Sequence, residues 1–135
     1  MVILLSGGTR LARAAIASKL LEKHSKLRHL PMEEIASSMS MLGITGKGSE
    51  PMLLSLACEC AHDMEKEKFS TIISCAANDE NIWIFREQFP KKAIAIALVS
   101  KPGDSSEGYD VEADMKKMTA EHAANEISKI LGAKK

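Results

Sequence analysis

The residues with the clearest chemical potential form one turn near the start of the chain. An apolar run over residues 1–6 leads into Gly7 and Gly8, and Thr9 then opens a helical pattern. Glycine lets backbone N–H groups approach an anion closely, and the first turn of a helix presents free N–H groups with partial positive charge. The turn therefore predicts a phosphate site, with a tight strand–helix turn that binds nothing as the alternative. The predicted phosphate- or nucleotide-binding residues are Gly7, Gly8, Thr9, Arg10, Leu11, Ala12, Arg13 and Ala14.

Two cations elsewhere in the sequence are candidates for an accessory role. Lys47 stands between Gly46 and Gly48 in a loop, where its ammonium group could reach a phosphate. Arg86 lies on the helix that follows a predicted central strand, so it could face the ligand cleft. The simpler interpretations are a solvated loop lysine and a surface arginine, and both stay open.

The cysteines and histidines do not predict a metal site. Cys58 and His62 are four residues apart on one predicted helix, a spacing that can hold a metal ion. Cys60 falls on a different face, and no second cluster supplies the remaining ligands. Cys75 ends a predicted central strand, where a buried thiol is the simpler interpretation and a reactive one the alternative.

The elements that would position these residues alternate between strands and helices. The strongest strand predictions are residues 1–6, 69–75 and 93–99, and weaker ones are 26–30 and 109–113. Helices are expected over 9–23, from Pro31 to about 42, from Pro51, over about 78–89 and from Thr119 to Gly132. Asn78 and Asp79 are expected to cap the fourth helix, and Thr119 the fifth.

The first helix is expected to bury one face and expose the other. Leu11 and Leu21 are assigned to the buried face, whereas Arg13 and Lys19 are assigned to solvent.

The strand–helix alternation predicts the fold class. The central strands are apolar throughout rather than alternating, which is typical of a parallel sheet covered on both faces. We therefore expect residues 1–135 to form a single α/β domain, a three-layer α/β/α sandwich with about five parallel strands and residues 2–6 in the centre.

Composition indicates which binding partners and which cellular compartment to expect. Eighteen Lys and Arg residues balance eighteen Asp and Glu residues, so no net field would attract nucleic acid or an anionic membrane. The three cysteines, an odd number, lie inside predicted elements, and the first apolar run has no basic flank, so a cytoplasmic protein is expected. Methionines on helical faces suit either the core or contact between copies, which leaves a homo-oligomer open.

Four stretches of the chain resemble small P-loop kinases. In the pattern G-x-x-x-x-G-K-[ST], Gly7 matches the first glycine, while Ala12, Arg13 and Ala14 replace the last three residues. Residues 71–77, followed by Arg86, resemble the third strand and next helix of adenylylsulfate and gluconate kinases. Residues 93–99 and 118–127 resemble their fourth strand and closing helix. The resemblance implies strand order 2-3-1-4-5, ATP or another nucleotide as cofactor, and a small phosphate-bearing ligand.

Departures from the kinase pattern weaken the expected activity. Arg13 keeps a charge but is bulkier than lysine, and Ala14 has no hydroxyl group for magnesium. The segment 101–108, where these kinases carry an arginine-rich lid, has one lysine and no arginine. We therefore expect a nucleotide- or phosphometabolite-binding protein that is weak or inactive as a phosphotransferase.

Two other functions stay open. One is a non-catalytic regulatory or interaction module that keeps the fold. The other is a dinucleotide-binding domain, because Gly7 and Gly8 also match the glycine turn of short-chain dehydrogenases. Those enzymes carry a Tyr-x-x-x-Lys pair, whereas Tyr109 is followed four residues later by Ala113.

Overall fold

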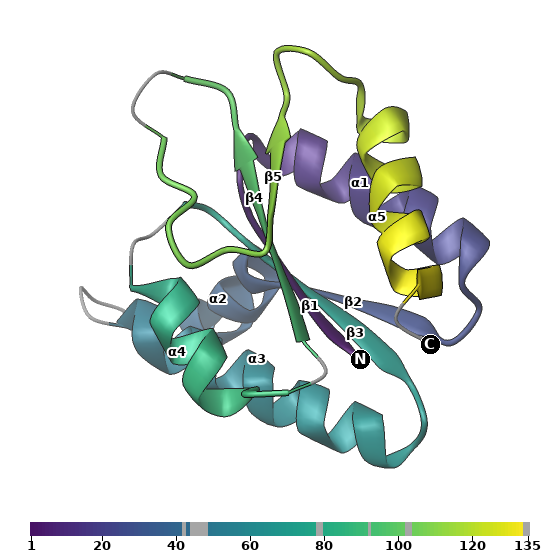
Figure 1. Ribbon diagram of the computed structural model, residues 1–135. Helices are drawn as coiled ribbons and strands as arrows, with labels where there is room; N and C mark the ends of the chain where they lie inside the picture. Colours follow the sequence, from purple (N-terminus) through teal and green to yellow (C-terminus); the bar gives the residue numbers. More distant parts are fainter. Residues whose placement is uncertain (42, 44–48, 78–79, 92, 102–103, 134–135) are drawn as a thin grey trace.

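A computed structural model of the chain describes residues 1–41, 43, 49–77, 80–91, 93–101 and 104–133 (Figure 1). In chain order the elements are β1 (Val2–Gly7), α1 (Arg10–Lys23), β2 (Leu27–Pro31), α2 (Met32–Met41), α3 (Ser49–Lys66), β3 (Ser70–Cys75), α4 (Asn81–Gln88), β4 (Ala93–Val99), β5 (Val111–Asp114) and α5 (Ala120–Ala133).

The five strands form one parallel sheet in the order β2-β3-β1-β4-β5. β1 is central, and its Ile3 pairs with Ile72 of β3 on one side and with Ile94 of β4 on the other. The expected topology and the central position of the first strand are confirmed.

Helices cover both faces of the sheet. Figure 1 shows α1 and α5 on one side and α2, α3 and α4 on the other. Successive strand residues point to opposite faces, so β1 sends Ile3 and Leu5 into the core beneath α1 and α5 and Val2 and Leu4 into the second core. The three-layer sandwich is confirmed.

The buried face of α1 differs from the expectation. Arg13 is only 4% exposed and lies with Ile16 and Leu20 on the buried face, whereas Leu11 is 82% exposed. The assignment of Arg13 to solvent and Leu11 to the core is therefore wrong. The short turn after β1 determines which face of α1 packs on the sheet. It places Arg13 on that face, against the carbonyl groups of Gly7 and Gly8. Burial of the guanidinium is offset by hydrogen bonds, described below.

Several element ends also shift. Pro31 closes β2 instead of opening a helix, and the edge strand begins at Val111 rather than at Tyr109. α5 continues through Gly132 to Ala133. Thr119 does cap α5, because its Oγ1 accepts a hydrogen bond from the His122 N–H at 3.1 Å.

Asn78 and Asp79, the expected caps of α4, lie outside the described residues. The N-cap of α4 is Glu80, and its side chain makes no capping hydrogen bond.

The crossover from β4 to β5, residues 100–110, has no helix in its described part. Val111 pairs with Ile96 in the middle of β4, so the chain must travel back along the sheet before β5 begins. Asp110 anchors this return, since its N–H donates to the Ala95 carbonyl at 2.9 Å and its carboxylate accepts from the Ala95 N–H at 2.8 Å. In the described part of the chain, none of the helices is long and apolar enough to span a bilayer.

Candidate functional site

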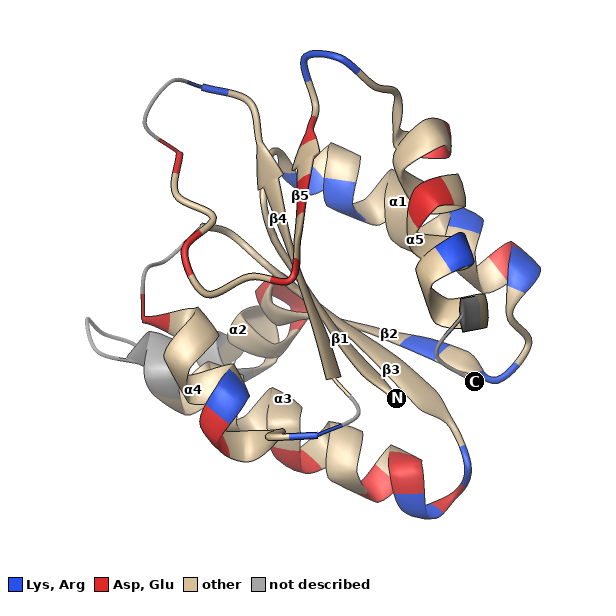
Figure 2. Cartoon of the chain, viewed as in Figure 1, with Lys and Arg blue, Asp and Glu red and all other residues tan. Residues whose placement is uncertain are grey.

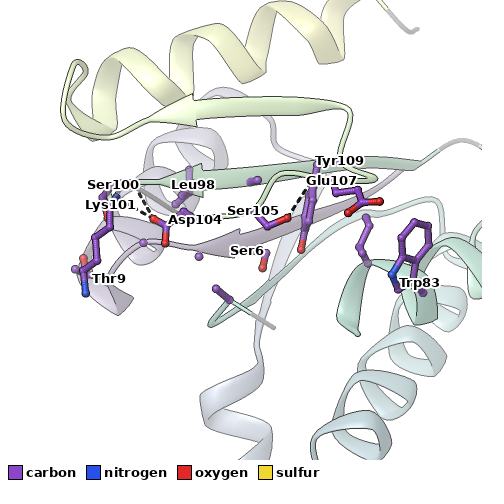
Figure 3. Close-up of a pocket in the computed structure, with 15 residues that line it drawn as sticks. Ser6, Thr9, Trp83, Leu98, Ser100, Lys101, Asp104, Ser105, Glu107 and Tyr109 are labelled. Atoms are coloured by element: carbon purple, nitrogen blue, oxygen red, sulfur yellow. Dashed lines mark hydrogen bonds between the residues drawn. The ribbon is translucent and has the colours of Figure 1, made fainter. Parts of the chain in front are cut away.

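A cavity of about 430 Å³ lies at the carboxyl edge of the sheet (Figure 3). Five segments line it: the end of β1 with the turn after it, the residues after β3, the start of α4, the end of β4 and the crossover. Parallel α/β sheets bind ligands at this edge. The lining residues are Ser6, Gly7, Gly8, Thr9, Ala77, Ile82, Trp83, Ala97, Leu98, Ser100, Lys101, Asp104, Ser105, Glu107 and Tyr109.

The turn between β1 and α1 has only two residues, Gly8 and Thr9. Gly7 and Gly8 have φ angles of +94° and +63°, a region that other residues rarely adopt. A Cβ atom on Gly7 would lie 2.5 Å from the Leu98 carbonyl oxygen, so β4 leaves no room for a side chain there. Thr9 is the N-cap of α1, because its side chain accepts a hydrogen bond from the Ala12 N–H at 3.0 Å.

Arg13 supports this turn from inside the protein. Its Nη1 donates to the Gly7 carbonyl at 2.9 Å and to the Gly8 carbonyl at 3.2 Å, and its Nη2 pairs with the Glu33 carboxylate. A trans peptide bond directs each carbonyl and the next N–H in opposite directions. The N–H groups of Gly8 and Thr9 therefore point away from Arg13. Arg13 does not line the cavity, so it positions these donors rather than occupying the cavity itself.

The ion pair sets the charge state of Glu33. Burial acts to raise the pKa of Glu33, but hydrogen bonds from its own backbone N–H and from Arg13 outweigh this and hold the pKa below its ordinary value. Glu33 is thus a carboxylate that neutralises Arg13 and ties α2 to the turn.

The cavity brings together only part of the predicted phosphate site. Gly7, Gly8 and Thr9 line it, whereas the other five predicted residues do not. In the P-loop pattern the residues after the first glycine belong to the phosphate-binding loop. Here Arg10, Leu11, Ala12, Arg13 and Ala14 already belong to α1.

One predicted accessory cation, Arg86, also lies outside the cavity lining. Arg86 Nη2 donates to the Asp110 carboxylate at 2.7 Å and to the Gly108 carbonyl at 3.2 Å, so it fastens the crossover to α4. Lys47 lies outside the described residues.

The lining includes residues that the sequence reasoning did not assign to a site. Lys101 was noted only as a loop lysine, and Trp83, Glu107 and Tyr109 received no role. The single tryptophan of the chain was the available signal. Trp83 is 57% exposed, a large fraction for so bulky an apolar residue.

The cavity walls carry mixed charge. Among the described residues, Lys101 is the one cation in the lining, and Asp104 and Glu107 are its carboxylates. Hydrogen bonds from the backbone N–H groups of Ser100 and Lys101 hold the pKa of Asp104 below its ordinary value. Figure 2 shows the acidic residues along the crossover between β4 and β5.

The end of β3 is buried and carries no carboxylate. P-loop enzymes hold magnesium with a P-loop hydroxyl group and an aspartate. Here β3 ends in Ser74 and Cys75, and Ala76 and Ala77 follow. Burial raises the pKa of the Cys75 thiol, and Asn81 Nδ2 donates to its sulfur at 3.5 Å. Within the described residues, no three His, Cys, Asp or Glu side chains are grouped to hold a metal ion.

The Cys58 and His62 pair is also accounted for by packing. Burial raises the pKa of Cys58 to about 12, so its thiol stays protonated. The His62 ring stacks on Phe89 with 4.3 Å between centroids.

Comparisons with known proteins give the fold. No family model matches the sequence, and no curated protein does. Among solved structures, the tunicamycin resistance protein of Deinococcus radiodurans has a TM-score of 0.71 at 14% identity, covering 97% of this chain and 95% of that chain. A sugar kinase from Janibacter sp. has a TM-score of 0.71 at 14% identity, covering 97% of this chain and 94% of that chain. The APS kinase of Mycobacterium tuberculosis has a TM-score of 0.71 at 8% identity, covering 96% of each chain.

The chain has the fold of the small P-loop kinases. The likeness extends over nearly the whole length of each structure, and it confirms the kinase-like topology that the sequence patterns implied.

Proposed function

We propose that this protein binds a small phosphate-bearing ligand, a nucleotide or phosphometabolite, and transfers phosphoryl groups weakly or not at all. The observation that supports binding is the cavity at the turn after β1. There Arg13 directs the N–H groups of Gly8 and Thr9 away from the protein interior, next to the first turn of a 14-residue helix. A helix start with free N–H groups favours an anion.

The proposed loss of catalysis rests on what surrounds the cavity. Phosphoryl transfer depends on metal and cationic groups that stabilise the charge of the transferring phosphoryl group. Ala14 is an exposed helical residue without a hydroxyl group, β3 ends without a carboxylate, and the described part of the crossover supplies only Lys101. Anion binding needs fewer of these groups than catalysis does, so it can persist without them.

A non-catalytic interaction module is the second candidate function. The observation that favours it is the exposure of large apolar side chains outside the cavity, above all Leu11 at 82% and Met41 at 88%.

The three cysteines are unpaired, which supports the cytoplasmic location expected for either function.

Trp83 provides the test, since it is the only tryptophan and lines the cavity. Its fluorescence should change on titration with inorganic phosphate, ADP or ATP, with little dependence on magnesium. Lys101→Gln should weaken binding by about threefold to tenfold, the range for one partly exposed charge-assisted bond. Lys117→Gln, an exposed lysine outside the lining, is the matched control.

Two results would contradict the proposal. One is the absence of binding by both fluorescence and calorimetry at millimolar concentration, which would favour the interaction module. The other is turnover of ATP at ordinary kinase rates, on the order of 1–100 per second.

A further inference from the structure

The cavity has two ends of different chemistry (Figure 3). Thr9 and Lys101 lie at one end, beside the N–H groups of the turn. Trp83, Glu107 and Tyr109 lie at the other end, where the crossover meets α4. A ligand that fills the cavity must therefore make favourable contacts at both ends.

The second end pairs an indole with a carboxylate. The crossover packs directly on the indole, since a Cβ atom on Gly108 would lie 3.3 Å from Trp83 Cη2. Glu107 precedes Gly108, and Figure 3 shows its side chain at the same end of the cavity as Trp83. The Glu107 N–H donates to Ser105 Oγ, but its carboxylate has no hydrogen-bond or ion-pair partner among the described residues. An indole face next to a carboxylate is a favourable site for an organic cation.

The charge of the described lining residues also favours a cationic group on the ligand. Among the lining residues that the structure describes, the carboxylates of Asp104 and Glu107 outnumber the ammonium group of Lys101. Asp104 is committed to the backbone N–H groups of Ser100 and Lys101, which leaves Glu107 to meet the ligand. A ligand with one phosphate and one cationic group would match this surface better than a polyanion such as a nucleoside triphosphate.

We infer that the ligand is a phosphate monoester that carries a protonated amine. Its phosphate binds the N–H groups of Gly8 and Thr9 with Lys101, and its ammonium group binds between Trp83 and Glu107. This inference rests on the proposed function and narrows it to one class of phosphometabolite.

The test compares matched compounds that differ in the amine alone. Glucosamine 6-phosphate is compared with glucose 6-phosphate, and phosphoethanolamine with ethyl phosphate, by calorimetry and by Trp83 fluorescence. In at least one pair the amine should bind about fivefold tighter or more, the effect of one partly exposed charge interaction. Glu107→Gln should remove this preference and leave the affinity for the amine-free compound unchanged or slightly higher. Glu59→Gln, an exposed glutamate on α3, should keep the preference.

The outcomes separate this inference from the proposed function. Equal affinity within both pairs, or a preference that survives Glu107→Gln, would overturn the amine inference and leave phosphate binding intact. Failure of every phosphate compound to bind, inorganic phosphate included, would overturn the proposed function and the inference with it.

Discussion

Arg13 shows how one buried charge can organise a turn. Its guanidinium connects two carbonyl groups of the turn after β1 to Glu33 of α2. A lysine at this position could not form the same fork of hydrogen bonds, because its ammonium is a single compact donor. The arginine therefore fits a structural role that a phosphate-binding lysine would not.

Replacing Arg13 should destabilise the protein. Arg13→Met leaves the Glu33 carboxylate and two carbonyl groups without their donor, which should lower the free energy of unfolding by about 2–4 kcal/mol. Urea unfolding measures the change. Lys19→Met on the same helix is the control, since its ion pair with Glu22 is exposed and should contribute less than about 0.5 kcal/mol. Equal losses in the two variants would contradict this account of Arg13.

Gly7 should tolerate no side chain. Gly7→Ala combines a positive φ with a Cβ atom 2.5 Å from the Leu98 carbonyl oxygen. Gly43→Ala has a similar φ of +81°, and no atom of the described residues lies within 4 Å of its Cβ position. Gly43→Ala should cost about 1 kcal/mol, the price of backbone strain, and Gly7→Ala clearly more. Thermal unfolding of both variants measures the difference, and a smaller loss for Gly7→Ala would refute the close contact with β4.

Sequence reasoning located the turn but missed the residues around it. Gly7 and Gly8 are recognisable because a positive φ requires glycine. The burial of Arg13 was not predictable from periodicity, which assigns a charged residue to solvent unless its partners are known. Trp83 on α4 and Glu107 on the crossover are distant in sequence and line the same end of the cavity only because the crossover folds back onto α4, so no local pattern joins them.

At the scale of the element, apolar strands were the most predictable feature. Residues 70–75 and 93–99 were found within one residue because a buried parallel strand is apolar throughout. Helix starts were less predictable. Pro31 suits a first helical position, yet it pairs with Ser74 as the last residue of β2.

The caps of α1 and α5 form a natural pair for comparison. Thr9→Ala and Thr119→Ala each remove one side-chain hydrogen bond to a first-turn N–H. Each should lower the free energy of unfolding by about 1 kcal/mol. Only Thr9 lines the cavity, so only Thr9→Ala should also change the affinity for inorganic phosphate. Calorimetric titration of both variants distinguishes the shared effect from the specific one.

The link between α2 and the turn should weaken in acid. The folded-state pKa of Glu33 lies below its ordinary value of 4.5, so its carboxylate stabilises the fold above that value. This contribution is lost as the pH falls below 4.5 and through the folded-state pKa. Urea unfolding from neutral pH to about pH 3 should show a steeper loss for the wild type than for Glu33→Gln. Parallel pH profiles of the two proteins would contradict the ion pair's role.

At the scale of the whole molecule, the crossover from β4 to β5 takes the place of a covering helix. Its position depends on Asp110, which binds β4, and on Arg86, which binds Asp110 and Gly108. The cavity wall at Glu107 and Tyr109 therefore depends on an ion pair outside the cavity.

Arg86→Ala should loosen the crossover without unfolding the sheet. The free energy of unfolding should fall by about 0.5–1.5 kcal/mol, because the Arg86–Asp110 pair is partly exposed. Limited proteolysis within residues 100–110 should become faster, and Trp83 fluorescence should shift as the packing of Gly108 is lost. Lys129→Ala, which removes an exposed pair on α5, is the control and should leave proteolysis unchanged.

The two-residue turn after β1 also limits how this protein could evolve. Substituting Ala12, Arg13 and Ala14 toward the kinase pattern would change residues that already belong to a helix, and Arg13 is needed to hold the turn. A glycine inside the helix would cost up to about 1 kcal/mol and would add no backbone to surround a phosphate chain. A longer loop requires inserted codons, and single-nucleotide changes cannot supply them. Any lineage carrying this turn would thus find a full phosphate-binding loop hard to acquire by ordinary mutation, while remaining free to alter what its cavity binds.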